Sequence, residues 1–289
     1  MRSLHLILLA AVLASAAWGA TPARAEDDDA RGLSPSAPAP AAPTAPALDM
    51  ALTPASPARD IPWDRLDRAA YERVRDVVQG AVVSREVRDI AFRSRKPVFE
   101  FLLDHPDFAA GVARALREGK YRVRPVGDGW EADDGHGAHG RLRVFYAESG
   151  RRLFYLEGRY DTPLLPTLSG RLVMMLDTDH VEGSDGITYC EMRVAGHLRL
   201  DSTAAEVVAT VARSFGEAQV DKKVRRFFRH VAKVSRRAYD DPEGLADDLA
   251  RRPELSAEQV TRFREVLLAH LPPGWSETLD FRLLDAPLH

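Results

Sequence analysis

Hydrophobic and polar positions divide the chain into an apolar leader, a spacer and a folded region. Leu4 to Ala17 is an almost unbroken apolar run, whereas residues 30–58 consist mostly of Ala, Pro, Ser and Thr. A segment of the second kind cannot bury a core and favours extended, solvated backbone. Regular hydrophobic periodicity starts near Trp63, so we predict that folded structure begins there.

The first part of the folded region combines helical and strand periodicities. Asp64 is a suitable N-cap for a helix that ends at Gly80. Pro97 is suited to the first turn of a second helix, and Pro106 marks a break before a third. The elements predicted here are helices over residues 66–78, 96–103 and 108–116, and a β-branched strand over residues 83–92.

After Gly119 the pattern changes to short alternating runs separated by turns. Ser149-Gly150-Arg151 is a strong hairpin signal, and the prolines and glycine of residues 163–170 favour a loop. The predicted strands cover residues 121–125, 140–148, 152–161, 171–178 and 187–200. This spacing of strands and turns predicts an antiparallel meander.

One long amphipathic helix follows the meander. Ser202 is a good N-cap, and apolar residues recur at three- and four-residue intervals from Val207 to Val234. Such a stripe must lie along a large apolar surface, and the meander supplies one. Pro242 ends this helix, and a polar stretch leads to a last helix over residues 256–270.

This order of elements resembles the START-like superfamily, also called the helix-grip or polyketide cyclase/dehydrase and lipid-transport group. The likeness covers residues 82–239 and rests on the segment 98–104 and on the long helix after Leu200. It implies an α+β fold in which a curved antiparallel sheet grips a long C-terminal helix. The extra N- and C-terminal helices that the sequence predicts lie outside this family pattern. The predicted segments are a signal peptide over 1–25, a linker over 26–62, the START-like domain over 63–240 and a helical extension over 241–289.

The resemblance further implies a pocket for a hydrophobic molecule such as a lipid, sterol, hopanoid, quinone or polyketide. Methionines and aromatic residues suit an adaptable apolar site. On the strands, Leu142, Val144 and Tyr146 are expected to share one face. The competing interpretation is that these side chains only fill the core. The candidate lining residues are Phe101, Leu142, Val144, Tyr146, Phe154, Leu156, Tyr160, Met174, Tyr189, Met192, Val211 and Phe215.

The leader has the order of features that a secretory signal requires. Arg2 precedes the apolar run, Ala23-Arg24-Ala25 offers a small-x-small cleavage site, and the acidic residues 26–29 follow. The run is shorter than the roughly 20 residues that span a bilayer. With no cysteine at the cleavage site to carry a lipid, we expect a soluble periplasmic or secreted protein.

Charge argues against a nucleic-acid partner, and the single cysteine leaves no intramolecular disulfide possible. Cleavage would remove Arg2 and Arg24 from the 40 basic residues and leave 38 against 43 acidic ones, a net charge of −5. Nucleic-acid binding needs a basic excess, so no nucleic-acid partner is expected. The single cysteine, Cys190, lies in the alternation of a predicted strand and is interpreted as a small buried hydrophobe.

A positive stripe on the long helix suggests an anionic membrane surface as a partner. Its members are spaced four, three, four and three residues apart and therefore lie on one helix face; they are Lys222, Arg226, Arg229, Lys233 and Arg236. A cationic face of this kind attracts anionic lipid headgroups. The alternative is an ordinary solvated face, neutralised by acids such as Asp240 and Asp241.

Metal and catalytic constellations are weak in this sequence, so we expect no cofactor and no metal. The segment Asp177-Thr178-Asp179-His180 is better explained as a solvated strand end, and His136 and His139 as members of a hairpin loop. The polar strand residues worth inspecting for catalysis are Glu157, Tyr160, Glu191 and His197. The leading hypothesis is a non-catalytic carrier; the alternatives are a cyclase- or hydrolase-type enzyme using the same cavity, or a ligand-free envelope interaction module.

Overall fold

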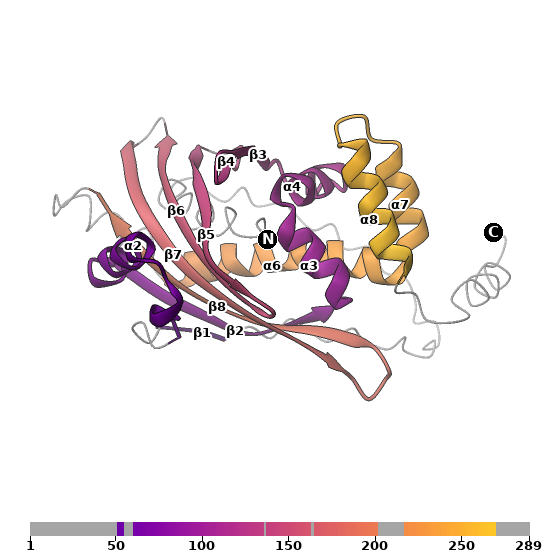
Figure 1. Ribbon diagram of the computed structural model, residues 1–289, viewed down its shortest axis with the longest axis horizontal. Coiled ribbons are helices and arrows are strands. Elements are labelled where there is room, and N and C mark those ends of the chain that lie inside the picture. The colour runs from indigo at the N-terminus through magenta and orange to yellow at the C-terminus, as the bar shows by residue number, and fades with distance from the viewer. Residues whose placement is uncertain (1–50, 55–59, 136, 163–164, 202–216, 270–289) are drawn as a thin grey trace, which may run out of the picture.

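The computed structural model describes residues 51–54, 60–135, 137–162, 165–201 and 217–269. It is an α+β structure built on one open antiparallel sheet of eight strands in the order β1-β2-β8-β7-β6-β5-β4-β3 (Figure 1). The strands are β1 Ala51–Pro54, β2 Val83–Arg93, β3 Arg122–Val126, β4 Gly129–Asp133, β5 Ala138–Glu148, β6 Arg151–Thr162, β7 Leu165–Glu182 and β8 Thr188–Leu200. The predicted meander is therefore present, and β2 pairs antiparallel with β8.

The helices lie against both faces of the sheet and beyond one end of it (Figure 1). They are the 3-10 turn η2 Trp63–Arg65, α2 Arg68–Gln79, α3 Lys96–Asp104, α4 Pro106–Ala115, α6 Glu217–Asp240, α7 Pro242–Ala250 and α8 Ala257–Ala269. Asp67, and not Asp64, caps α2, because its Oδ1 accepts a hydrogen bond from the Ala70 amide at 2.8 Å. The predicted start of the long helix at Ser202 lies outside the described residues.

Two sequence predictions about proline-containing segments are wrong. The expected loop over residues 163–170 is largely strand, since β7 begins at Leu165. Pro166 is tolerated there because pairing with β8 starts only at Gly170, so that β7 has a single partner strand at the proline. In addition, the polar stretch after Pro242 forms α7: Asp241 caps it, and the proline that ends α6 occupies the first turn of α7.

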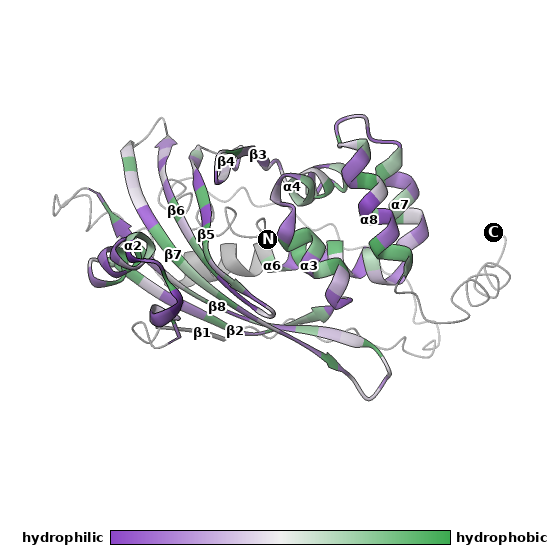
Figure 2. Cartoon of the chain, in the orientation of Figure 1, coloured by the Kyte–Doolittle hydropathy of each residue, from purple (hydrophilic) through white to green (hydrophobic). Residues whose placement is uncertain are grey.

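The two faces of the sheet have different coverings. We call the face that meets α6 the inner face, because Phe228 and Val231 pack there with residues of β2 and β4 to β8. The outer face packs against α2, where Val74 and Val77 contact alternate residues of β6 and β7. A third apolar cluster joins α3 and α4 to α7 and α8, so the C-terminal helices belong to the folded body (Figure 2).

A row of small residues crosses the inner face of the sheet. The register places Ala132, Gly140, Gly158 and Gly170 side by side on β4, β5, β6 and β7. A Cβ atom on Gly158 would meet the carbonyl oxygen of His139 and would lie 2.9 Å from the Cα of Gly140. Glycine is therefore required where these backbones approach, and it permits the bend that curves the sheet around its inner face.

Candidate functional site

The inner face of the sheet brings together seven of the predicted lining residues. These are Leu142, Val144, Phe154, Leu156, Tyr160, Met174 and Met192. Ile90 and Phe92 of β2, Phe99 and Leu103 of α3, and Phe228 of α6 pack in the same cluster. The alternation of β5 to β8 produces this surface, because every second side chain points to the same side.

Tyr146 lies on the outer face, so the prediction that it shares a face with Leu142 and Val144 is wrong. The ladder between β5 and β6 shifts register here: Val144 pairs with Phe154, but Tyr146 pairs with Leu153. Phe145 is the extra residue of this β-bulge, and a single inserted residue sends the following side chains to the opposite face. Alternation in the sequence alone does not reveal the insertion.

The other predicted lining residues lie elsewhere. Phe101 points away from the sheet into the helical cluster, where its ring centroid is 5.3 Å from that of Phe263. The helical period explains this, since Phe99 and Leu103 occupy the sheet-facing side of α3. Tyr189 donates a hydrogen bond to Asp185 at 2.8 Å, at the turn between β7 and β8. Val211 and Phe215 lie outside the described residues.

A buried ion pair on the inner face was not predicted from the sequence. Arg152 is only 1% exposed and donates through Nη2 to Glu100 of α3, while its Nη1 donates to the carbonyl of Arg151 at 3.1 Å. Arg152 Nε and Glu100 Oε1 are buried without a hydrogen-bond partner among the described residues. The missed signal was positional: Arg152 precedes Phe154 and Leu156 by two and four residues and therefore shares their face.

His180 and Cys190 are direct neighbours on β7 and β8 beneath α3. The His180 ring packs 6.0 Å from Phe99, and burial lowers the pKa of this imidazole. Burial also raises the pKa of the Cys190 thiol above its usual range. The thiol is fully buried and protonated, as expected for a small core hydrophobe and not for a nucleophile.

Of the four polar strand residues singled out for catalysis, only Tyr160 reaches the inner face. Glu157 and Glu191 are exposed. His197 is buried on the outer side, where its Nδ1 lies 2.9 Å from the Ser84 hydroxyl. Burial alone lowers the pKa of His197, which makes it a structural imidazole held in its neutral form.

The lowered pKa of His197 predicts how the free energy of unfolding changes with pH. The unfolded chain protonates this residue near its ordinary pKa of about 6.5, whereas the folded chain does so only at lower pH because its pKa is lowered. Between these two values the unfolded state binds more protons, so the free energy of unfolding falls as the pH falls. Urea titrations at pH 7 and pH 5.5 are expected to show a smaller loss for His197→Gln than for the wild type. Equal losses in the two proteins would contradict this role.

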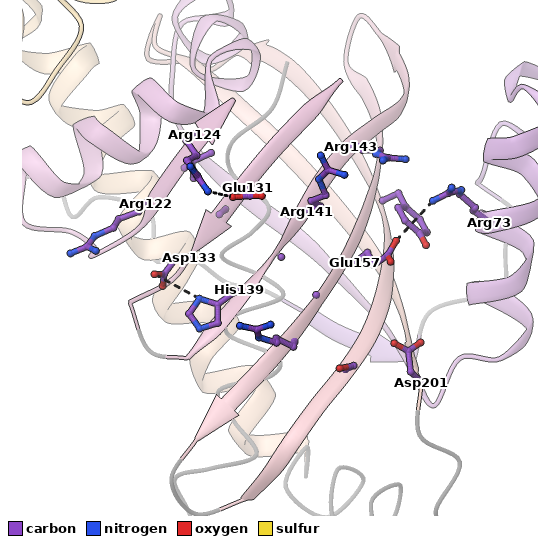
Figure 3. A pocket seen from close by; sticks show the side chains of 17 residues that line it. Arg73, Arg122, Arg124, Glu131, Asp133, His139, Arg141, Arg143, Glu157 and Asp201 are labelled. Atoms are coloured by element: carbon purple, nitrogen blue, oxygen red, sulfur yellow. Dashed lines mark hydrogen bonds and ion pairs between the residues drawn. The ribbon is translucent and has the colours of Figure 1, made fainter. Parts of the chain in front are cut away.

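A groove lies on the outer face over β3 to β7, with α2 along one side of it (Figure 3). Its volume is about 900 Å³. Six arginines and four carboxylates line it; they are Arg73, Arg122, Arg124, Arg141, Arg143 and Arg159, with Glu131, Asp133, Glu157 and Asp201. His139 also lies in the groove, with Nδ1 3.8 Å from Asp133 Oδ2 and Nε2 3.9 Å from Asp161 Oδ2.

Two further candidates from the sequence concern metal binding and membrane crossing. Within the described ranges, no group of three or more His, Cys, Asp and Glu side chains is arranged to hold a metal ion. Asp177 instead bonds Arg151 at 2.9 Å and Arg193 at 2.8 Å, and His136 lies outside the described residues. None of the helices described for this chain combines the length and apolar character needed to cross a bilayer.

The cationic stripe of α6 is only partly described. Lys233 is paired with Glu118 at 3.2 Å, as the solvated-face alternative expects. Arg229 and Arg236 are exposed, while the side chains of Lys222 and Arg226 lie outside the described part. Docking on an anionic membrane stays a prediction.

The fold and site define this chain as an α+β protein with an open antiparallel sheet and an apolar inner face. No family model and no curated protein matches the chain. It is similar in structure to a conserved protein from Geobacillus kaustophilus, with a TM-score of 0.36 and 13% identity over 51% of this chain and 93% of that one. It is also similar to the di-domain ARO/CYC BexL from the BE-7585A biosynthetic pathway, with a TM-score of 0.33 and 18% identity over 58% of this chain and 55% of that one. Both TM-scores lie below 0.5, so these similarities define neither a family nor a function for this chain.

Proposed function

We propose that this chain is an exported START-like protein whose sheet grips the C-terminal helix and holds a hydrophobic ligand, such as a lipid, between them without transforming it. The observation that carries the proposal is the inner face. Apolar side chains of β2 and β4 to β8 form one surface there, and Phe228 and Val231 of α6 meet it. A surface of this extent needs an apolar cover, which a helix, a ligand or both supply.

The composition of the inner face favours a ligand as part of that cover. The row of Ala132, Gly140, Gly158 and Gly170 lets four adjacent strands bend around this face. Met174 and Met192 are flexible and polarisable, and they adapt to apolar groups of irregular shape. The bend that these glycines permit makes the inner face concave, and a concave apolar face lined in part by methionines suits a hydrophobic ligand.

Native mass spectrometry of the protein purified from its own cell envelope tests the carrier hypothesis. We expect a bound species that organic extraction releases and that lipid analysis identifies. Leu156→Trp enlarges a side chain on the inner face and is expected to displace the bound species. Leu153→Trp makes the same change at a buried leucine on the outer face of the same strand and is expected to retain it. Repeatedly empty wild-type protein, or equal loading of the two variants, would overturn the proposal.

Export is tested separately by the mass of the mature chain. Cleavage after Ala25 leaves Glu26 as the first residue and removes the whole apolar run. The protein recovered from the periplasm or the medium is expected to have the mass of residues 26–289. A full-length chain retained in the cytoplasm would reject export and would leave the ligand hypothesis intact.

A cyclase- or hydrolase-type enzyme is the second candidate, and the polar groups on the inner face favour it. Tyr160 is buried there, and burial raises the pKa of its phenol, so the group is a proton donor at neutral pH. The Arg152–Glu100 pair also lies on this face. If the enzyme hypothesis holds, the ligand extracted from Tyr160→Phe is converted on incubation with the wild type to a species that chromatography and mass spectrometry separate from it, and it stays unchanged with Tyr160→Phe.

A further inference from the structure

The outer groove contains an arginine that the sheet register leaves without a counter-charge. Arg141 of β5 is flanked in register by Glu131 of β4 and by Glu157 of β6. Both carboxylates are engaged by other arginines: Glu131 pairs with Arg124, and Glu157 lies 3.9 Å from Arg73 of α2 (Figure 3). Among the described residues, Arg141 therefore has no ion pair, although two acids adjoin it.

Arg122 repeats this arrangement at the edge strand. It lies opposite Asp133 in the pairing of β3 with β4. The Asp133 carboxylate instead faces His139, at 3.8 Å (Figure 3). Arg122 is exposed and, within the described ranges, forms no ion pair with a carboxylate. Arg143 and Arg159 pair with Asp128 and Asp161. Arg122 and Arg141 are thus the two lining arginines that form no ion pair among the described residues.

We propose that this groove binds a small organic dianion that carries phosphate or carboxylate groups. Guanidinium forks recognise these groups through paired, charge-assisted hydrogen bonds. Two arginines without ion pairs suit a dianion, and a groove of about 900 Å³ is large enough for a small molecule. The buried ring of Tyr155, which stacks on Phe145 at 4.9 Å, supplies an apolar wall.

The composition of the groove argues against larger anionic partners. Four carboxylates line it, and the whole chain has a net charge of −3, so a nucleic-acid backbone would meet repulsion on most sides. The groove also lies on the outer face, away from the apolar inner face. Binding there is therefore independent of the proposed hydrophobic ligand.

Calorimetry with glycerol phosphate as the probe tests the site, with glycerol as the neutral control. We expect the wild type to bind the phosphate and not glycerol, and Arg141→Gln to weaken binding at least tenfold. Arg122→Gln is expected to weaken it several-fold. Arg264→Gln, which removes an exposed arginine paired with Asp247 on α8 and α7, is expected to leave the affinity unchanged.

The location is checked by nuclear magnetic resonance, in which amides of β4 to β6 are expected to shift during the titration. Leu156→Trp on the inner face should bind the probe as the wild type does, so loss of the hydrophobic ligand and loss of the dianion are separable. The proposal is overturned if Arg141→Gln binds as tightly as the wild type, if the shifts lie elsewhere, or if the protein binds only vesicles of anionic lipid.

Discussion

Gly158→Ala is expected to lower the free energy of unfolding by about 2 kcal/mol or more, because the new methyl group has no space between two strands. Its position would overlap the carbonyl oxygen of His139 and would lie 2.9 Å from the Cα of Gly140. Backbone atoms form this obstacle, so no side-chain rearrangement relieves it. Thermal and urea unfolding followed by circular dichroism measure the change, and a loss of this size lowers the melting temperature by roughly 4–8 °C in a domain of this length.

Gly196→Ala is the matched control on the same sheet. Gly196 lies on β8, where an added Cβ would meet only a side-chain methyl group of Leu172, at 3.7 Å. That is an ordinary contact distance, and replacing glycine also reduces the entropy of the unfolded chain. We therefore expect Gly196→Ala to be neutral or to stabilise the protein by up to about 1 kcal/mol. If both variants lose the same stability, the close approach at Gly158 is not what restricts that position to glycine.

The sequence predicted the inner face better than it predicted the site residues. Apolar alternation located β8 and the central part of β5 to β7, and the structure places the predicted lining residues Met174 and Met192 on the side that meets α6. The β-bulge at Phe145 turns the Tyr146 side chain to the outer face, because one extra residue shifts the phase of the alternation without changing the composition. Phe101 was misplaced for a different reason: α3 is apolar on two sides, and only the presence of α8 decides which side Phe101 joins.

The outer groove could not have been predicted from the sequence. Arg141, Glu131 and Glu157 belong to three strands, and their neighbourhood depends on a register that no local pattern specifies. The pairing of arginines with carboxylates depends further on the position of Arg73 on α2, because Arg73 pairs with Glu157. Charges that appear evenly mixed along the chain are therefore unbalanced once the strands pair.

Arg152→Met is expected to destabilise the protein by about 3 kcal/mol or more, because it leaves the largely buried Glu100 carboxylate without its arginine partner. The Arg152 side chain is 2% exposed and that of Glu100 is 21% exposed, so little water is available to solvate a charge left alone. Glu100→Met should also be costly, since it leaves the guanidinium with only Asp104, 3.9 Å away, as a counter-charge. Urea denaturation of both single variants measures these losses.

The double variant Arg152→Met/Glu100→Met decides between a structural and a chemical role for this pair. Replacing a buried ion pair by apolar side chains of similar volume is often neutral or stabilising, so the double variant should recover most of the stability that either single change removes. The exposed pair Arg264–Asp247, with side chains 45% and 53% exposed, is the control, and each of its single changes should cost less than about 1 kcal/mol. Losses that simply add in the double variant would show that Arg152 and Glu100 do not stabilise each other. A stable double variant that still holds the hydrophobic ligand but no longer converts it would favour the enzyme over the carrier, because the pair would then be required for the chemistry and not for the fold.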